Sequence, residues 1–245
     1  HCYPRKGIDT GDNDRFLRFW PEINIKTASI IDHNTRHKWM PYNKGGEFRK
    51  WYGNREVLIN WDDQGSEIKS RLSWKTKKPT IRNSKFHFKE GFSWTTVSSS
   101  GFSCRFVPKG CLFDNGGCTL FSDDRLLIFG ALLNSCVAKR YFEFLSPTLN
   151  FQPGDIGKML FYEPRGKVDE IENTTKLLIK ISTYDWDSRE TSWDFEQSPL
   201  LNGAPSLSDA YARWLEGVSR DFFQLHANEE ELNRIFIEIY GLQEE

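Results

Sequence analysis

Residues 122–145 read SDDRLLIFGALLNSCVAKRYFEFL, and the pattern of the whole chain changes at this stretch. Its apolar residues recur at spacings of three or four, at Leu126, Phe129, Leu133, Val137, Tyr141 and Phe144. This spacing is typical of a helix with one wide apolar face, and the Ser-Asp-Asp before it supplies candidate caps. We therefore predict one helix over residues 126–145 that serves as scaffold, with its apolar face buried under a sheet.

The chain before this helix consists of short apolar runs separated by turn-forming residues. Examples are residues 57–61, which precede Asp-Asp-Gln-Gly, and residues 101–107, which precede Pro108. Such runs indicate β-strands joined by turns. We expect a turn at residues 62–65, and a short closing strand at Leu160 and Phe161.

The chain after Pro164 is acidic and helical in pattern. We predict a helix that includes residues 168–181, a second over residues 210–222 capped by Ser208 or Asp209, and a third over residues 232–239. The third is expected to be capped near Asn228 and to end at Gly241. The fold class is therefore α+β, with a β-rich lobe at residues 1–165 and a helical acidic lobe at residues 166–245.

Composition limits the class of protein. The 245 residues are 38% hydrophobic and 15% aromatic, which suits a chain with a packed core. No apolar run approaches the ~20 residues that span a bilayer, and no signal peptide is visible. The five cysteines match no common zinc spacing, so we expect free thiols and a cytoplasmic location. Because the chain begins at His1, we expect a piece of a larger protein.

Charge is distributed unevenly along the chain, although the net charge is only −1. Residues 36–90 carry 14 Lys/Arg against six Asp/Glu, together with six Trp and Tyr residues. Residues 181–245 carry four Lys/Arg against 14 Asp/Glu. A basic, aromatic-rich block of this kind is typical of nucleic-acid contact, because cations meet phosphates and planar rings stack on bases.

Two groups of cations stand out in the basic block. One contains Lys44, Arg49, Lys50 and Arg55, and the other contains Lys75, Lys77, Lys78, Arg82 and Lys85. Amide and hydroxyl side chains between and after them are of the types that hydrogen-bond to base edges. The alternative is an ordinary solvated basic face around core aromatics.

Two acidic clusters offer other interpretations. Asp62, Glu67 and Lys69 resemble the carboxylates and lysine that metal-dependent nucleases place around a cation. The alternative for this short pattern is a simple turn at Gly65. Asp185, Asp187 and Glu190 form the second cluster, which suits either a cation site or an ordered loop anchored by tryptophans.

The sequence contains no catalytic motif that we can assign. It lacks an Asn/Asp-Pro-Pro-Tyr/Phe loop, a glycine-rich dinucleotide motif and a P-loop. No spacing identifies a catalytic triad or dyad. We therefore assign no catalytic residue, no metal and no cofactor to this chain.

Several segments together resemble the region that follows the catalytic domain in large adenine-specific DNA methyltransferases. They are Gly7–Trp20, Lys38–Gly46 continuing to Trp51–Gly53, Gly91–Thr95, Pro108–Gly117, Leu132–Ser135, Pro147–Ile156, Asp185–Phe195 and Glu231–Gln243. The combination is similar to the PglX-like methyltransferases of BREX phage-exclusion systems and to TaqI-like or type I specificity domains. The resemblance covers nearly the whole chain.

The resemblance implies a target-recognition region that binds double-stranded DNA for an N6-adenine methyltransferase. It also implies that S-adenosylmethionine and the base-flipping loop belong to the parent enzyme's methyltransferase domain, which would be a partner of this region. Other expected partners are defence-system subunits or a phage inhibitor. We expect no contact with a membrane. In a different functional class, the chain is an interaction module that docks an acidic protein.

On this basis we predict two sets of DNA-contacting residues. The phosphate contacts are Lys44, Arg49, Lys50, Lys75, Lys77, Lys78 and Arg82. The base contacts are drawn from Asn43, Asn83, Ser93, Trp94, Thr95 and Ser98.

Overall fold

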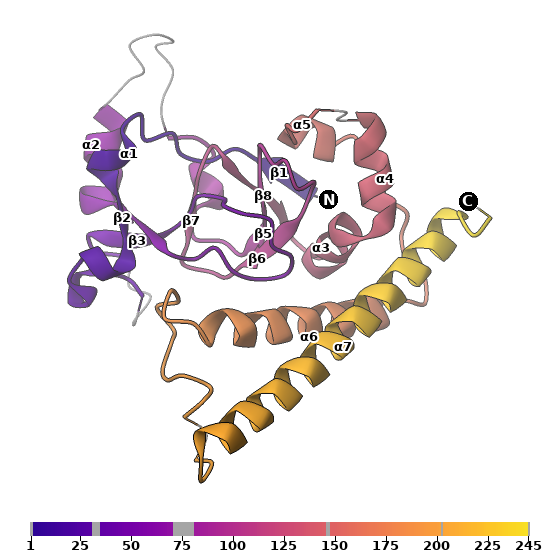
Figure 1. Ribbon diagram of the computed structural model, residues 1–245. Coiled ribbons are helices and arrows are strands. Elements are labelled where there is room, and N and C mark those ends of the chain that lie inside the picture. Colours follow the sequence, from indigo (N-terminus) through magenta and orange to yellow (C-terminus); the bar gives the residue numbers. More distant parts are fainter. Residues whose placement is uncertain (1, 31–34, 71–80, 146–147, 202, 245) are drawn as a thin grey trace.

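The computed structural model describes residues 2–30, 35–70, 81–145, 148–201 and 203–244. It contains two small sheets and a set of helices, which confirms the α+β class (Figure 1). The first sheet has the order β1-β8-β5-β6 and is antiparallel throughout, with β1 at Cys2–Arg5, β8 at Gly117–Ser122, β5 at Gly91–Thr95 and β6 at Cys104–Val107. The second has the order β2-β4-β3-β7, with β2 at Leu17–Phe19, β4 at Val57–Asn60, β3 at Trp39–Asn43 and β7 at Leu112–Phe113.

Strand β5 shows why the first sheet is buried on both faces. Its Phe92 and Trp94 are fully buried and pack with Phe129 and Leu133 of α3 (Leu126–Asn134). Side chains alternate along a strand, so Ser93 points to the opposite face, where Asn43 of the second sheet meets it. The predicted strands at residues 57–61 and 101–107 are confirmed as β4 and β6.

The predicted helix at residues 126–145 is two helices, and the prediction of one was wrong. Helix α3 ends at Ser135, whose ψ of 162° is extended, and α4 (Cys136–Leu145) follows directly. The Ser135 hydroxyl donates to the carbonyl of Leu132 at 2.6 Å and accepts from the amide of Ala138 at 3.3 Å. The apolar spacing continues across this break, so the sequence pattern does not reveal it. As expected, α3 is buried against β5 and β6.

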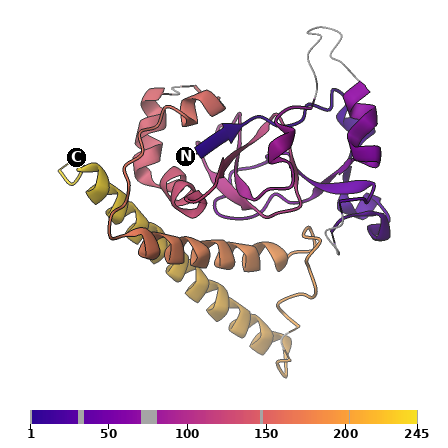
Figure 2. The same cartoon turned by 180° about the vertical axis from the view of Figure 1, so that it is seen from behind.

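The two C-terminal helices are longer than predicted. Helix α6 covers Val168–Asp187, and α7 covers Leu207–Tyr240 as one continuous helix. Two helices were predicted in place of α7, but Asn228 lies within it and Ser206 provides the cap, accepting from the amide of Asp209 at 3.1 Å. The predicted end at Gly241 is confirmed by its left-handed φ of 68°. Figures 1 and 2 show α6 and α7 crossing near α3 and diverging toward the segment that joins them.

The expected turn at residues 62–65 is present, because Asp63, Gln64 and Gly65 have left-handed, non-helical backbone angles and the Gly65 amide donates to the carbonyl of Trp61 at 3.2 Å. The turn lies within the bounds of α2 (Asp62–Ser70) and leads into helix, not into the second strand of a hairpin. Another prediction of local structure was wrong. Leu160 and Phe161 form no strand, and the Phe161 ring packs against Phe129 of α3 at 4.6 Å between centroids.

Short helical elements connect the strands. They are α1 (Asn13–Phe16), η1 (Trp20–Glu22), η2 (Ile25–Thr27), η3 (Ser84–Phe86) and α5 (Pro153–Ile156). The five cysteines are free, and three of them are buried. No helix within the described ranges is both long and apolar enough to cross a membrane.

The division between residues 165 and 166 remains a prediction. Helix α6 begins two residues later, at Val168. One apolar cluster nevertheless joins α3, α6 and α7: Ile128 and Leu132 of α3 pack with Leu178 of α6 and Phe236 of α7. The helical segment therefore shares a core with the strand-rich part of the chain.

Candidate nucleic-acid interface

Three predicted base-contacting residues lie inside the fold. Asn43 is 6% exposed, and its amide donates to the hydroxyl of Ser93, which is fully buried. The Ser93 hydroxyl in turn donates to the carbonyl of Cys118 at 2.9 Å. Trp94 is also fully buried, and its indole N–H donates to the carbonyl of Phe151 at 2.8 Å. A base contact needs an accessible polar atom, so these three predictions do not agree with the structure.

Thr95 holds a turn that carries a predicted phosphate contact. Its hydroxyl donates to the carbonyl of Gly46 at 2.7 Å. Gly45 and Gly46 have φ of 96° and 130°, a conformation that favours glycine, and Lys44 before them is exposed. Ser98 lies farther along, where its backbone amide donates to the carbonyl of Leu149 at 3.0 Å. The Thr95 hydrogen bond to Gly46 thus holds the turn that carries Lys44.

The neighbouring cations Arg49 and Lys50 are engaged by the acidic helices. Arg49 pairs with Asp185 of α6, and its guanidinium lies 5.1 Å from the Trp186 ring. Lys50 pairs with Glu229 of α7 at 2.9 Å. A phosphate that approached either cation would compete with these carboxylates. The acidic segment therefore neutralises part of the basic block.

The second predicted group of cations is only partly within the described residues. Lys75, Lys77 and Lys78 lie outside them. Arg82 is half-buried, with one guanidinium nitrogen 3.5 Å from the Asn115 side-chain oxygen. Asn83 has a left-handed φ of 54°, and its amide donates to the backbone carbonyl of Lys6 at 2.8 Å.

This last contact brings in two residues that the sequence did not suggest, Arg5 and Lys6. Arg5 and Lys6 line one cavity of about 460 Å³ together with Asn83 and Lys85. The first two are almost 80 residues before the others, and no local pattern links them. The pairing of β1 with β8 and the hydrogen bond from the Asn83 amide to the Lys6 carbonyl bring these segments together, and the sequence shows neither contact.

Arg105 is a third cation that the sequence did not suggest. It is 1% exposed in β6, and burial lowers its pKa to about 10. Its Nη2 is 3.4 Å from the Thr95 hydroxyl, while Nε and Nη1 have no hydrogen-bond partner in the described parts of the chain. The arginine lies behind the Thr95 contact with the Lys44 turn, and its burial keeps it from direct contact with a ligand.

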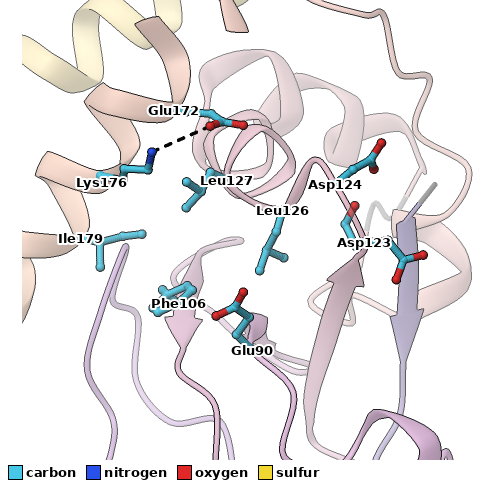
Figure 3. Close-up of a pocket in the computed structure, with 10 residues that line it drawn as sticks. Glu90, Phe106, Asp123, Asp124, Leu126, Leu127, Glu172, Lys176 and Ile179 are labelled. Carbon is cyan, nitrogen blue, oxygen red and sulfur yellow. Dashed lines mark ion pairs between the residues drawn. The ribbon is translucent and has the colours of Figure 1, made fainter. Parts of the chain in front are cut away.

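A different cavity, of about 440 Å³, is acidic and apolar. Glu90, Asp123, Asp124 and Glu172 line it, and its one lysine, Lys176, is paired with Glu172 at 3.9 Å (Figure 3). Clustered carboxylates repel phosphate, so this cavity does not suit a DNA backbone.

The nuclease interpretation finds no support in the geometry. Glu67 pairs with Arg15, and the Lys69 ammonium lies 5.9 Å from the Trp61 ring, so neither is grouped around a cation position with Asp62. No group of three or more His, Cys, Asp or Glu side chains suited to a metal occurs among the residues the structure describes.

The other acidic cluster is an ordered structural element. Asp185 pairs with Arg189 at 2.9 Å as well as with Arg49, and Asp187 accepts from the Ser192 hydroxyl at 2.7 Å. These bonds hold the end of α6 and the residues after it.

Comparison with known proteins supplies the family context. No family model matches the chain. It is 39% identical over 257 aligned positions to the adenine-specific methyltransferase PglX of Lacticaseibacillus casei (strain Zhang), covering 98% of this chain and 21% of that protein. It is 38% identical over 245 positions to the adenine-specific methyltransferase BrxX of Escherichia coli O9:H4 (strain HS), covering 97% and 19%.

A solved structure shares the fold. The type IIL restriction-modification enzyme MmeI, solved in complex with DNA, superposes with a TM-score of 0.60 over 100% of this chain and 33% of its own, at 14% identity. The family resemblance predicted from the sequence is confirmed: over 97–98% of its length this chain is similar to part of the PglX and BrxX adenine-specific methyltransferases, and it spans about a fifth of their length.

Proposed function

We propose that this chain is the target-recognition region of an adenine-specific DNA methyltransferase in a phage-defence or restriction-modification system. Its function is to bind double-stranded DNA and to select the sequence that is methylated. The observation that carries this proposal is the similarity to two adenine-specific methyltransferases over nearly the entire chain. The shared fold with an enzyme solved on DNA supports it.

The surroundings of the predicted cations indicate which of them are available to contact DNA phosphates. Lys44 is exposed on a glycine turn, whereas Arg49 and Lys50 are paired with carboxylates. Arg82 is half-buried and directly precedes Asn83, which lines the basic cavity. We therefore propose Lys44 and Arg82 as phosphate contacts, with Thr95 as a positioning residue for the Lys44 turn.

S-adenosylmethionine does not fit this chain. Methyltransferases and other nucleotide enzymes bind nucleosides at the carboxyl ends of parallel strands. Among the described strands, only the short pair β3 and β7 is parallel. We propose that the cofactor binds in a methyltransferase domain of the parent protein, and that this chain contributes DNA binding alone.

The proposal is tested by duplex binding in the full-length protein. Fluorescence anisotropy with a panel of competitor duplexes should show a preference for one sequence over the others. The Lys44→Gln and Arg82→Gln variants should weaken binding to every duplex, since phosphate contacts carry no base information. Lys180→Gln, an exposed lysine of α6, is the matched control and should bind like the wild type.

Equal binding to all duplexes would refute sequence selection by this chain. No duplex binding, combined with salt-sensitive capture of an acidic protein, would instead favour the interaction-module alternative.

A further inference from the structure

Three cations, one from the first strand and two from the segment around residue 86, surround the ring of Phe86. The Phe86 ring centroid lies 5.1 Å from the Lys85 ammonium, 5.5 Å from the Arg5 guanidinium carbon and 5.7 Å from the Lys89 ammonium. Phe86 is 5% exposed, so its ring is buried and the three cations pack against it from outside. Contact with a ring face holds a cation in place without neutralising it.

Two of these cations line the cavity of about 460 Å³ noted above, which is a shallow depression open to solvent. Arg5, Lys6 and Lys85 supply its positive charge, and Asn83 and Gln152 supply side-chain amides, with Pro4, Pro153 and Gly154 completing the lining. No carboxylate is part of this lining. Positive charge and amide donors without a counter-charge form an environment suited to an anion.

The cavity is held by contacts between distant segments. Strand β1 places Arg5 opposite Thr119 of β8. Asn83 then fixes the following residue, because its amide donates to the Lys6 carbonyl at 2.8 Å. Its left-handed φ of 54° starts the short helix that presents Lys85. The cations are therefore positioned by backbone pairing rather than by acidic partners.

The carboxylate that follows the lining residues in the sequence does not neutralise Arg5, Lys6 or Lys85. Asp155, which follows the cavity-lining residues, pairs with Lys158 at 3.4 Å and accepts from the amide of Gln152 at 3.3 Å. Within the described part of the chain, neither Lys6 nor Lys85 forms an ion pair of 4.0 Å or less with an acidic side chain. Like charges this close repel one another, and an incoming anion relieves that repulsion.

We propose that this cavity binds a phosphodiester of the DNA backbone. The proposal rests on the function proposed above, and adds the residues Arg5, Lys6 and Lys85 to the DNA-contacting surface. A phosphate with its two non-bridging oxygens is the anion that matches two ammonium groups, a guanidinium and amide donors. The Asn83 amide already donates to the Lys6 carbonyl and the Gln152 amide to the Asn150 side chain, so the cavity offers mainly positive charge and fixes position and not sequence.

The test uses the full-length protein and the double variant Lys6→Gln/Lys85→Gln. Arg5 is left unchanged because its guanidinium also packs on Tyr3. The dissociation constant for duplex DNA is measured over a series of salt concentrations. The cavity is proposed to hold one phosphate, and each lost phosphate contact reduces the magnitude of the slope of log K against log salt by ~0.9, so the double variant should lose ~0.9. At low salt, we expect at least about a tenfold loss of affinity, equal for all sequences.

Two controls keep the result interpretable. Lys180→Gln should keep the wild-type slope, and the melting temperature of each variant shows that it is folded. A second arm titrates inorganic phosphate and follows the melting temperature, to separate a DNA phosphate from a free one. We expect phosphate alone to have no effect that depends on Lys6 and Lys85.

The outcomes separate this proposal from the proposed function. If the folded double variant keeps the wild-type salt slope, the cavity proposal is overturned while duplex binding by the wild type still stands. If phosphate stabilises the wild type but not the variant, and the slopes agree, the cavity serves a free phosphate and the DNA proposal is overturned. If the wild type binds no duplex, the proposed function fails, and this proposal fails with it.

Discussion

Gly130 of α3 offers a sharp test of the packing that supports the first sheet. In an open helix interior, replacing glycine by alanine stabilises a protein by ~1 kcal/mol. At Gly130, however, an added Cβ would lie 2.2–2.5 Å from three atoms of the Phe92 ring. Phe92 is fully buried, and its ring lies 5.7 Å from that of Phe106, so it has little room to move. Overpacking of this kind costs ~1–3 kcal/mol.

Because all three contacts are far below normal separation, we place the cost at the upper end, ~3 kcal/mol. After the helix-propensity gain, Gly130→Ala should lose ~2 kcal/mol, which corresponds to a fall in melting temperature of roughly 4–8 °C for a chain of this size. The matched control is Gly217→Ala in α7, where nothing lies within 4 Å of the added Cβ. This variant should gain ~1 kcal/mol, or roughly 2–4 °C.

Thermal unfolding followed by circular dichroism, with urea denaturation as an independent measurement, gives both values. The expected result is opposite signs for the two glycines. If Gly130→Ala melts at or above the wild-type temperature while Gly217→Ala rises as expected, then α3 does not approach β5 as closely as described.

Three further variants test other contacts. Burial lowers the pKa of His87 to about 4, so its contribution to stability is present above pH ~6.5 and is lost as the pH falls toward 4. In His87→Leu, the free energy of unfolding measured in urea should therefore fall less between pH 6.5 and 4, by up to ~3 kcal/mol. The same pH dependence in the variant and the wild type would contradict this. Glu229→Gln should lower the free energy of unfolding by ~1–2 kcal/mol, because Lys50 loses its half-buried carboxylate partner. The control Glu230→Gln changes an exposed carboxylate and should stay within ~0.5 kcal/mol of the wild type. Equal melting temperatures for the two variants would show that the Lys50–Glu229 pair does not stabilise the fold. Arg105→Met should be neutral or stabilising by ~1 kcal/mol in urea, because two buried nitrogens lack partners in the described chain, and a large loss would show that the guanidinium is satisfied.

The fold class followed from the sequence because the two periodicities are local. Short apolar runs such as residues 57–61 indicate strands, and the three-to-four spacing of apolar residues around Leu126 and Leu133 indicates a helix. The break at Ser135 was missed because apolar spacing continues across it. Helix α7 was divided in the prediction because Asn228 looks like a cap, although helix continuity depends on the packing of Leu232 and Phe236.

The interface was harder to predict because residue type does not reveal which side of a strand faces solvent. Asn43 and Ser93 are polar, yet they satisfy each other between the two sheets. Lys50 is basic, yet an acidic residue 179 positions away binds it. Lys6 joins Asn83 only through three-dimensional pairing. Each of these depends on contacts between distant segments, which one sequence without its structure does not specify.

The pairing of β1 with β8 also determines when the cation cluster can exist during synthesis and folding. Cys2 pairs with Ser122, so the register joins residues 120 positions apart. Closing so long a loop is slow, because its entropy is lost before the strand contacts compensate. Arg5 and Lys6 therefore reach Lys85 only after residue 122 has left the ribosome and the sheet has closed. Until then the nascent chain carries these cations as separate, mobile charges, and the assembled cluster is a property of the finished fold.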